Sequence, residues 1–186
     1  YEIGSGLVGS EMCIRDRYIP FDIWDYPDGQ LASYQEELVE QICRILFEHA
    51  PKLVLTPYLL DHPTDHQSTN TALAQALKSA IPIEPVIGMY EIWTPMANPN
   101  CYLNITGGYP QKCMAMKCYQ SQEEYFGIID KANALSTFRA KLSMKKRVEH
   151  MECFKLLKAT EYIEMVEEWK KIQRQEEGNE IEYAVY

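Results

Sequence analysis

Leu60–Thr69, which reads LDHPTDHQST, concentrates side chains that bind metals or transfer protons. It holds two of the chain's four histidines, and each lies directly beside an aspartate, in the pairs Asp61-His62 and Asp65-His66. A neutral imidazole is a nitrogen ligand for Zn²⁺, and an adjacent carboxylate can orient the ring and raise its basicity. Asp65-His66 therefore fits a metal ligand with its orienting partner, while His62 could face the same pocket and donate a hydrogen bond to an oxyanion.

The pattern alone leaves a second interpretation open, because a surface loop whose side chains only cap the next helix would show the same residues. Two ligand-type residues also do not complete a catalytic zinc site, which uses about three protein ligands and an open position. The other two histidines do not fill the gap. The helix dipole explains His49 at a helix C-terminus, and His150 is assigned a structural role in an amphipathic helix.

The elements around this stretch predict where it lies. Residues 52–56 (KLVLT) are a short apolar run between prolines, which is typical of a buried parallel strand, and the two His-Asp pairs follow as a loop. In open α/β sheets, ligands bind at this carboxyl end of the strands. One helix is predicted before the strand, over residues 33–50, and another after it, over residues 68–80.

Further strands are predicted at residues 86–93 (VIGMYEIW) and 101–106 (CYLNIT), and a short one at residues 18–24, before the turn in YPDGQL. The alternation of strands and helices predicts βαβ units, and therefore an α/β fold with a mostly parallel sheet. The rest of the chain is predicted to be helical, over residues 110–122, 123–142, 146–157 and 160–175.

Composition excludes several classes of protein. With 186 residues, 46% apolar and 24% charged, the chain suits one globular domain. The net charge of −9 argues against a general nucleic-acid binder, which needs basic side chains to neutralise phosphates. No apolar run approaches the ~18 residues of a membrane span, and no signal peptide is recognised. The six cysteines form no CxxC pair, and scattered thiols fit a reducing, cytoplasmic location.

Residues 1–16 do not match the rest of the chain in composition. They contain no initiator methionine and no periodicity, and Leu7–Asp16 reads as the translation of a common transposase sequencing adapter. Such junctions occur in proteins inferred from metagenome assemblies. We therefore interpret residues 1–16 as adapter-derived, and we expect the natural protein to be longer, with this chain as a truncated, C-terminal fragment.

Four segments resemble the PIG-L/LmbE family of zinc-dependent N-acetylglucosaminyl deacetylases. They are YPDGQL, KLVLTPYLLDHPTDHQSTNTALAQAL, YEIWTP and the run from NIT to KCMAMKCYQSQ, and they cover about residues 18–154. The resemblance implies a Rossmann-like three-layer α/β fold with a mostly parallel sheet, lacking its N-terminal strand-helix unit here and followed by C-terminal helices. We accordingly expect a deacetylase domain over residues 17–157, then a charged helix and polar tail over residues 158–186.

The resemblance also implies roles for individual residues. His66 would be the third zinc ligand, Asp65 the carboxylate that steadies the site, and His62 the group that stabilises an oxyanion or donates to the leaving amine. Asp28 and Asp61 are expected to bind the substrate. The family takes its other zinc ligands and its general base from an HPDD motif, which does not occur in this chain.

The implied activity is a zinc-dependent hydrolysis that removes an acetyl group from an N-acetylglucosamine-type sugar or a related amide. Because the HPDD motif is absent, we expect the chain as it stands to be inactive or weakly active. The alternative is a non-catalytic α/β module that binds a sugar or a protein partner. The expected partner is an N-acetylated sugar substrate, and no nucleic acid or membrane is expected as a partner. Whether the chain forms a homo-oligomer is left open.

Overall fold

The computed structural model describes residues 22–177, which divide into two compact units. The larger unit comprises residues 26–98 and 154–177, and the smaller unit comprises residues 22–25 and 99–153. The proposed adapter segment lies outside the described residues, so its interpretation stays a prediction.

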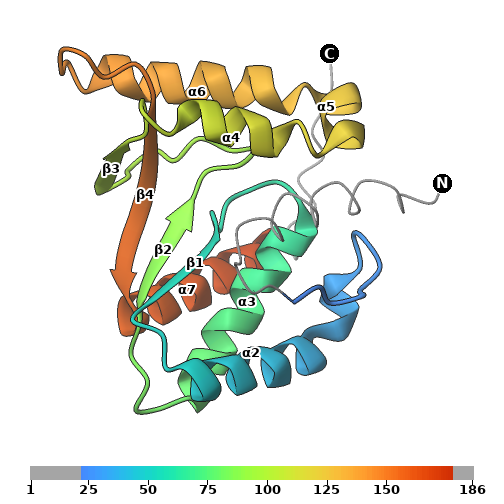
Figure 1. The fold of residues 1–186 in the computed structure, drawn as a ribbon. Helices are drawn as coiled ribbons and strands as arrows, with labels where there is room; N and C mark the ends of the chain where they lie inside the picture. Colours follow the sequence, from blue (N-terminus) through green and yellow to red (C-terminus); the bar gives the residue numbers. More distant parts are fainter. Residues whose placement is uncertain (1–21, 178–186) are drawn as a thin grey trace. The chain divides into compact units, whose positions relative to one another are not determined.

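A small sheet forms one layer of the larger unit (Figure 1). Its strands are β1 (Leu53–Pro57), β2 (Val86–Tyr90) and the second half of β4 (Met151–Lys158). β1 pairs in parallel with β2, and β2 pairs antiparallel with β4. The strand order is β1-β2-β4-β3, with β3 (Cys101–Asn104) in the smaller unit. The predicted α/β fold is therefore confirmed, but the sheet is mixed rather than mostly parallel because β4 runs antiparallel to its neighbour.

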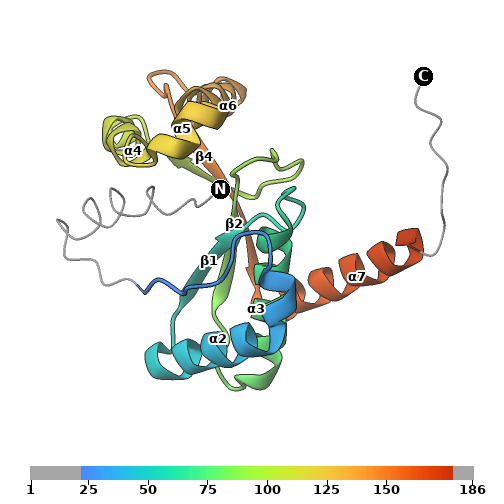
Figure 2. The same cartoon turned by 90° about the vertical axis from the view of Figure 1, so that its right-hand side faces the viewer.

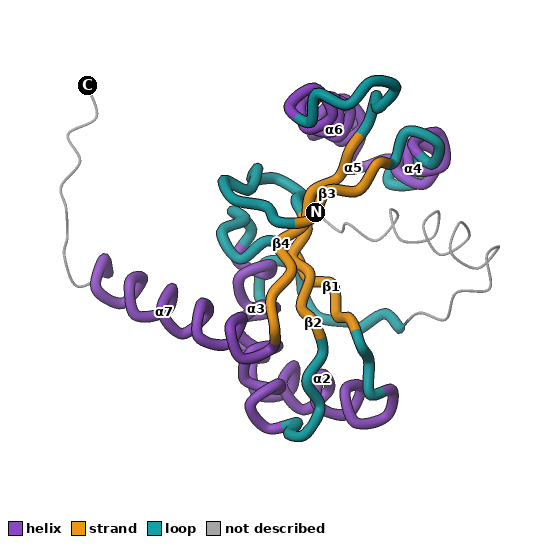
Figure 3. The backbone as a smooth tube through the Cα atoms, turned by 90° about the vertical axis from the view of Figure 1, so that its left-hand side faces the viewer, coloured by secondary structure: helices purple, strands orange, loops and turns teal. Residues whose placement is uncertain are grey.

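Helices cover one side of these strands. They are η1 (Leu31–Tyr34, a 3₁₀ helix), α2 (Gln35–His49), α3 (Thr64–Ser79) and α7 (Ala159–Glu177). α3 packs against both α2 and α7, and α3 and α7 lie on the same side of the strands (Figures 2 and 3). The core that they enclose includes Leu46, Leu73, Leu77, Ile87, Met89, Tyr162 and Val166.

The opposite face of the strands carries exposed apolar side chains. Successive strand residues point to opposite faces, and Ile87 and Met89 on the helix-covered face are fully buried. On the other face, Leu53 and Leu55 are 51% and 54% exposed, and Val86 is 40% exposed. β1 is also an edge strand of the sheet that the structure describes. The larger unit thus presents an apolar face beside an open strand edge.

The smaller unit is built around three short helices and β3. The helices are α4 (Tyr109–Met116), α5 (Gln120–Phe126) and α6 (Ile128–Leu142). The ring of His150 stacks on Tyr109 with centroids 3.5 Å apart, and its Nδ1 lies 3.1 Å from Ser136 Oγ. Tyr109 Oη donates a hydrogen bond to Asn133 Oδ1 at 3.3 Å. These contacts connect α4 and α6 to the residue that precedes β4.

One predicted helix is wrong. Residues 146–157 carry apolar side chains at helical spacing, but residues 151–158 form β4. Met151 and Cys153 are buried and Glu152 between them is not, which is the period of a strand. Residues 154–158 of β4 pair antiparallel with β2, and this tertiary pairing overrides the local helical pattern.

Two other elements differ in detail. The helix predicted over residues 123–142 is divided into α5 and α6, because Gly127 adopts a left-handed conformation with φ of 58° that ends α5. Of the strand predicted at residues 18–24, the described residues 22–24 form no regular element. The helices and strands predicted at residues 33–50, 52–56, 86–93, 101–106 and 160–175 are confirmed to within a few residues.

Within residues 22–177, no helix has both the length and the apolar character that crossing a membrane requires. The expected domain boundaries at residues 17 and 157 stay predictions.

Candidate functional site

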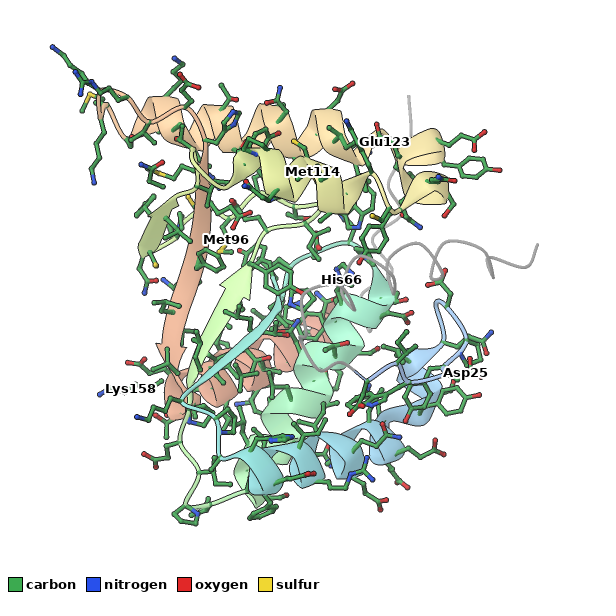
Figure 4. All side chains as sticks on the ribbon, viewed as in Figure 1. Asp25, His66, Met96, Met114, Glu123 and Lys158 are labelled. Atoms are coloured by element: carbon green, nitrogen blue, oxygen red, sulfur yellow. The ribbon has the colours of Figure 1, made fainter. Side chains whose placement is uncertain are left out.

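The two His-Asp pairs lie where β1 is followed by α3. β1 ends at Pro57 and α3 begins at Thr64, whereas the helix was expected to start near residues 68–69. Asp65 and His66 therefore lie in the first turn of α3 rather than in a loop, and Figure 4 shows His66 at this end of the helix. An aspartate is favourable in a first turn because the N-terminal end of the helix dipole attracts negative charge.

The ring of His66 is held by Asp61. His66 Nδ1 lies 2.8 Å from Asp61 Oδ2, and the two side chains are 23% and 0% exposed. Because a carboxylate only accepts hydrogen bonds, Nδ1 carries the proton and a neutral ring keeps its lone pair on Nε2. No group within residues 22–177 hydrogen-bonds Nε2. The pair therefore presents a basic nitrogen in a fixed direction, as a metal ligand or proton acceptor requires.

Backbone donors compensate for the full burial of Asp61. Asp61 Oδ1 accepts hydrogen bonds from the N–H groups of Trp93 (3.1 Å) and Thr94 (2.7 Å), which follow β2. Gln67 Nε2 donates to the Asp61 carbonyl oxygen at 3.0 Å and so ties the loop to α3. Such donors replace the water that a buried carboxylate has lost. The pKa of Tyr90 is raised, first by burial and then by the charge of Asp61.

Asp65 does not hold the ring of His66, contrary to the expectation from their adjacency. Its carboxylate accepts hydrogen bonds from Gly29 N–H (2.7 Å) and Leu31 N–H (3.1 Å). Neighbouring residues on a helix do not face each other, so the carboxylate and the ring point in different directions. Gly29 has a φ of 73°, which glycine adopts readily, and the turn before η1 can therefore bring both N–H groups to one carboxylate. Asp65 is the anchor of this turn.

The other two predicted site residues are exposed. His62 lies on the loop between β1 and α3, and its ring makes no hydrogen bond within the part of the chain that the structure describes. Asp28 lies in the turn that Asp65 anchors, directly before Gly29. The structure thus brings the backbone next to Asp28 to the N-terminus of α3. The roles of His62 and Asp28 stay predictions.

Sequence reasoning missed several groups around the His66–Asp61 pair. Asp61 was expected to bind substrate, but its carboxylate is occupied by His66 and by two backbone N–H groups. No residue pattern marks those N–H groups, because nearly every residue carries one. Asn70 could have been found, since it is a polar residue among the buried positions of α3 and is itself fully buried.

The donor set at this position fits one ligand of a metal ion rather than a complete site. His66 has the fixed Nε2 lone pair that a metal ligand needs, and the buried carboxylate behind it is the usual partner of such a ligand. Among residues 22–177, however, no three histidine, cysteine, aspartate or glutamate side chains form a group that would hold a metal ion. The described residues by themselves therefore do not form a complete metal site.

Part of the chain matches a known protein family. Residues 12–77 match the model of the PIG-L family, described as GlcNAc-PI de-N-acetylase. The match contains the turn before η1, the loop after β1 and most of α3. It begins within residues 1–16, so the end of the proposed adapter segment stays a prediction.

Solved structures share the fold. The conserved protein TT1542 from Thermus thermophilus is 20% identical with a TM-score of 0.67, over 82% of this chain and 75% of that one. N,N'-diacetylchitobiose deacetylase from Pyrococcus horikoshii, solved with its inhibitor MPG, is 19% identical with a TM-score of 0.65. That match covers 84% of this chain and 64% of the Pyrococcus chain, which is less than two thirds. The resemblance predicted from the sequence is thus confirmed over residues 12–77, which match the PIG-L family model, and the chain has the fold of these structures.

Proposed function

We propose that this chain is part of a metal-dependent hydrolase that removes an acetyl group from an N-acetylglucosamine-type sugar or a related amide. The PIG-L match, described as GlcNAc-PI de-N-acetylase, supports a deacetylase-type hydrolase, and the shared fold of the Pyrococcus deacetylase is consistent with it. The observation that carries the proposal is the His66–Asp61 pair, which lies inside the matched segment and fixes an imidazole for ligation.

In this proposal His66 is a ligand of the metal, and Zn²⁺ is the metal that we expect for a neutral imidazole combined with carboxylate ligands. When bound, the ion would supply Lewis-acid polarisation of the acetamide carbonyl and activation of water. The protein's own contribution is to keep the proton on His66 Nδ1, because Asp61 accepts it there at 2.8 Å.

The other residues shape the substrate site in the proposal. His62 is exposed beside the pair, so its ring can donate a hydrogen bond to the oxyanion that forms during amide hydrolysis, or to the leaving amine. Asp65 fixes the turn that carries Asp28, and the Asp28 carboxylate binds sugar hydroxyls. The role first expected for Asp65, to steady the metal site directly, is thereby replaced by a role in holding this turn.

The 186-residue chain is expected to hydrolyse substrate weakly or not at all, because its described residues form no group of three metal ligands. The test is to read the source DNA upstream of residue 17 and to express any extended protein that it encodes. The chain and the extended protein are then assayed for acetate release from an N-acetylglucosaminide with Zn²⁺ added. Activity that appears with the extension and is lost in His66→Ala would support the proposal.

The matched control is His49→Ala, which removes an exposed histidine at the end of α2 and should leave activity intact. If the extended protein binds N-acetylglucosamine but releases no acetate with any divalent metal, the non-catalytic binding module becomes the better interpretation. If acetate release survives His66→Ala, the proposed ligand role of His66 is wrong.

A further inference from the structure

The side chain of Asn70 hydrogen-bonds to residues on both sides of the loop that carries Asp61. It lies one turn after His66 on α3 and is fully buried. Its Nδ2 group donates hydrogen bonds to Pro57 O at 3.0 Å and to His66 O at 2.7 Å. Pro57 is the last residue of β1, and His66 lies in the first turn of α3. One amide therefore fixes both the start of the loop and the helix turn that bears the ring.

The amide of Asn70 can take only one orientation. Both groups that face Nδ2 are carbonyl oxygens, which only accept hydrogen bonds. A flipped amide would place Oδ1 against these two oxygens and leave buried groups without partners, which is costly. The orientation is completed on the other side by Tyr162, whose hydroxyl lies 2.7 Å from Asn70 Oδ1 and donates to it.

Tyr162 brings the C-terminal helix into this arrangement. It lies in the first turn of α7, its side chain is fully buried, and its hydroxyl also lies 3.2 Å from Asn70 O. Burial raises the pKa of Tyr162. Its phenol is therefore neutral at ordinary pH and stays a hydrogen-bond donor.

We infer that Tyr162 and Asn70 are positioning residues for His66, acting through the loop that carries Asp61. The Tyr162 hydroxyl holds the Asn70 amide, the amide holds Pro57 and His66, and the loop between them sets the distance from Asp61 to the ring. These hydrogen bonds matter for catalysis only under the proposed function, in which His66 is a metal ligand. Their effect on the His66 ring concerns the chain alone and can be tested without metal or substrate.

The experiment records long-range ¹H–¹⁵N spectra of the histidine rings in the ¹⁵N-labelled 186-residue chain, at one fixed, mildly alkaline pH. His66→Gln identifies the His66 signals by their loss. We expect the unmodified chain to show His66 as the single tautomer with its proton on Nδ1. In Tyr162→Phe, which removes only the hydroxyl, we expect His66 to lose this single-tautomer pattern while the His49 signals stay unchanged.

The matched control is Val166→Ala, one turn further along α7, where the side chain is also fully buried but makes only apolar contacts. This variant should lower stability and leave the His66 tautomer intact. The inference is overturned if Tyr162→Phe leaves the His66 signals unchanged, or if Val166→Ala alters them to the same degree.

If Tyr162→Phe does not fold, the unmodified chain still decides the question. The two Nδ2 protons of Asn70 should exchange slowly with water, and rapid exchange would overturn the inference. Titration of Zn²⁺ into the same sample separates the two proposals. The Zn²⁺ response of the His66 signals concerns only the ligand role of His66, and it leaves the comparison of Tyr162→Phe with Val166→Ala as it stands.

Discussion

Two half-buried histidines, one in each unit, show how the hydrogen-bond partner of Nδ1 decides what an imidazole ring can do. His66 meets the carboxylate of Asp61 at 2.8 Å, and no described group bonds its Nε2. His150 meets the hydroxyl of Ser136 at 3.1 Å, and its ring face is covered by Tyr109 at 3.5 Å. A carboxylate only accepts, so it fixes the proton on one nitrogen. The Ser136 hydroxyl also lies 3.2 Å from the Asn133 carbonyl oxygen, so it can donate to that oxygen or to His150 Nδ1 and imposes no tautomer by itself.

The backbone repeats this contrast. The His150 carbonyl accepts hydrogen bonds from the N–H of Ile105 and the hydroxyl of Thr106, so both its ring and its main chain serve to join elements of the smaller unit. Around His66, the hydrogen bonds hold the ring from behind and leave its other nitrogen available. The same side chain is therefore a structural element in one unit and a candidate ligand in the other.

Asp61→Asn should have the largest effect, because it reverses the chemistry of His66. The oxygen of the introduced amide would keep the N–H groups of Trp93 and Thr94, so its NH₂ group would donate to His66 Nδ1 and force the proton onto Nε2. We expect the free energy of unfolding to fall by roughly 3 kcal/mol, as for loss of a buried charge-assisted hydrogen bond. Urea denaturation measures the stability, and ring ¹⁵N shifts report the tautomer. Retention of the proton on Nδ1 would contradict the assignment.

The second largest expected effect is a loss of stability at alkaline pH through Tyr109 of the smaller unit. Burial, aided by Cys113 and Asp130, raises the pKa of Tyr109 to about 12 from its ordinary value near 10. The folded state thus favours the neutral phenol. The contribution of the neutral Tyr109 phenol to the free energy of unfolding is complete below pH 10. It is lost between about pH 10 and 12, because the unfolded chain ionises first, at no more than about 1.4 kcal/mol per pH unit.

Tyr109→Phe should remove that part of the alkaline loss of stability. The measurement is the urea midpoint of both proteins at several pH values from about 8 to about 12. The other tyrosines with raised pKa values are present in both proteins, so they affect both curves equally. Parallel curves for the two proteins would show that Tyr109 does not titrate in this range.

Asp65→Ala tests whether the two aspartates of the motif have separate roles. Two N–H groups of an exposed turn would lose their acceptor, and because water can replace it, we expect a cost of about 1 kcal/mol. Amide hydrogen exchange at Gly29 and Leu31 should become faster, while the His66 tautomer stays unchanged. A changed tautomer would restore Asp65 as the partner of His66.

Ser136→Ala should have the smallest effect. It removes the hydroxyl next to His150 Nδ1, and a neutral hydrogen bond of this kind contributes roughly 0.5–1 kcal/mol. The His150 ring signals should change and those of His66 should not. A shift of the His66 signals would mean that the two histidines do not respond independently.

Local patterns in the sequence predicted much of the larger unit. α2 and α3 show apolar residues at helical spacing, and β1 and β2 are short apolar runs bounded by turn residues, so periodicity and length were sufficient. β4 could not be found in this way. Its residues include Lys155 and Lys158, and its strand character comes from pairing with β2, a partner far earlier in the chain that no local window contains.

The site was predicted in part for the same reason. The position of His66 after a strand follows from chain order, and it is confirmed. The choice of Asp65 as the partner of His66 failed because adjacency in sequence is not adjacency on a helix, and the expected start of α3 was several residues too late. Had the helix been started at Thr64, Asp65 would have been directed away from the ring and Asp61 would have been the remaining carboxylate.

The apolar face and strand edge of the larger unit bear on self-association of the chain at high concentration. β1 has five residues and no charge, it lies at the edge of the described sheet, and Leu53 and Leu55 beside that edge are about half exposed. An uncharged edge of this kind is a template for pairing with another chain. During overexpression, pairing of this kind would compete with folding, and it would gain as the concentration of new chains rises. Slower synthesis, or chaperones that cover β1, should therefore raise the yield of folded protein.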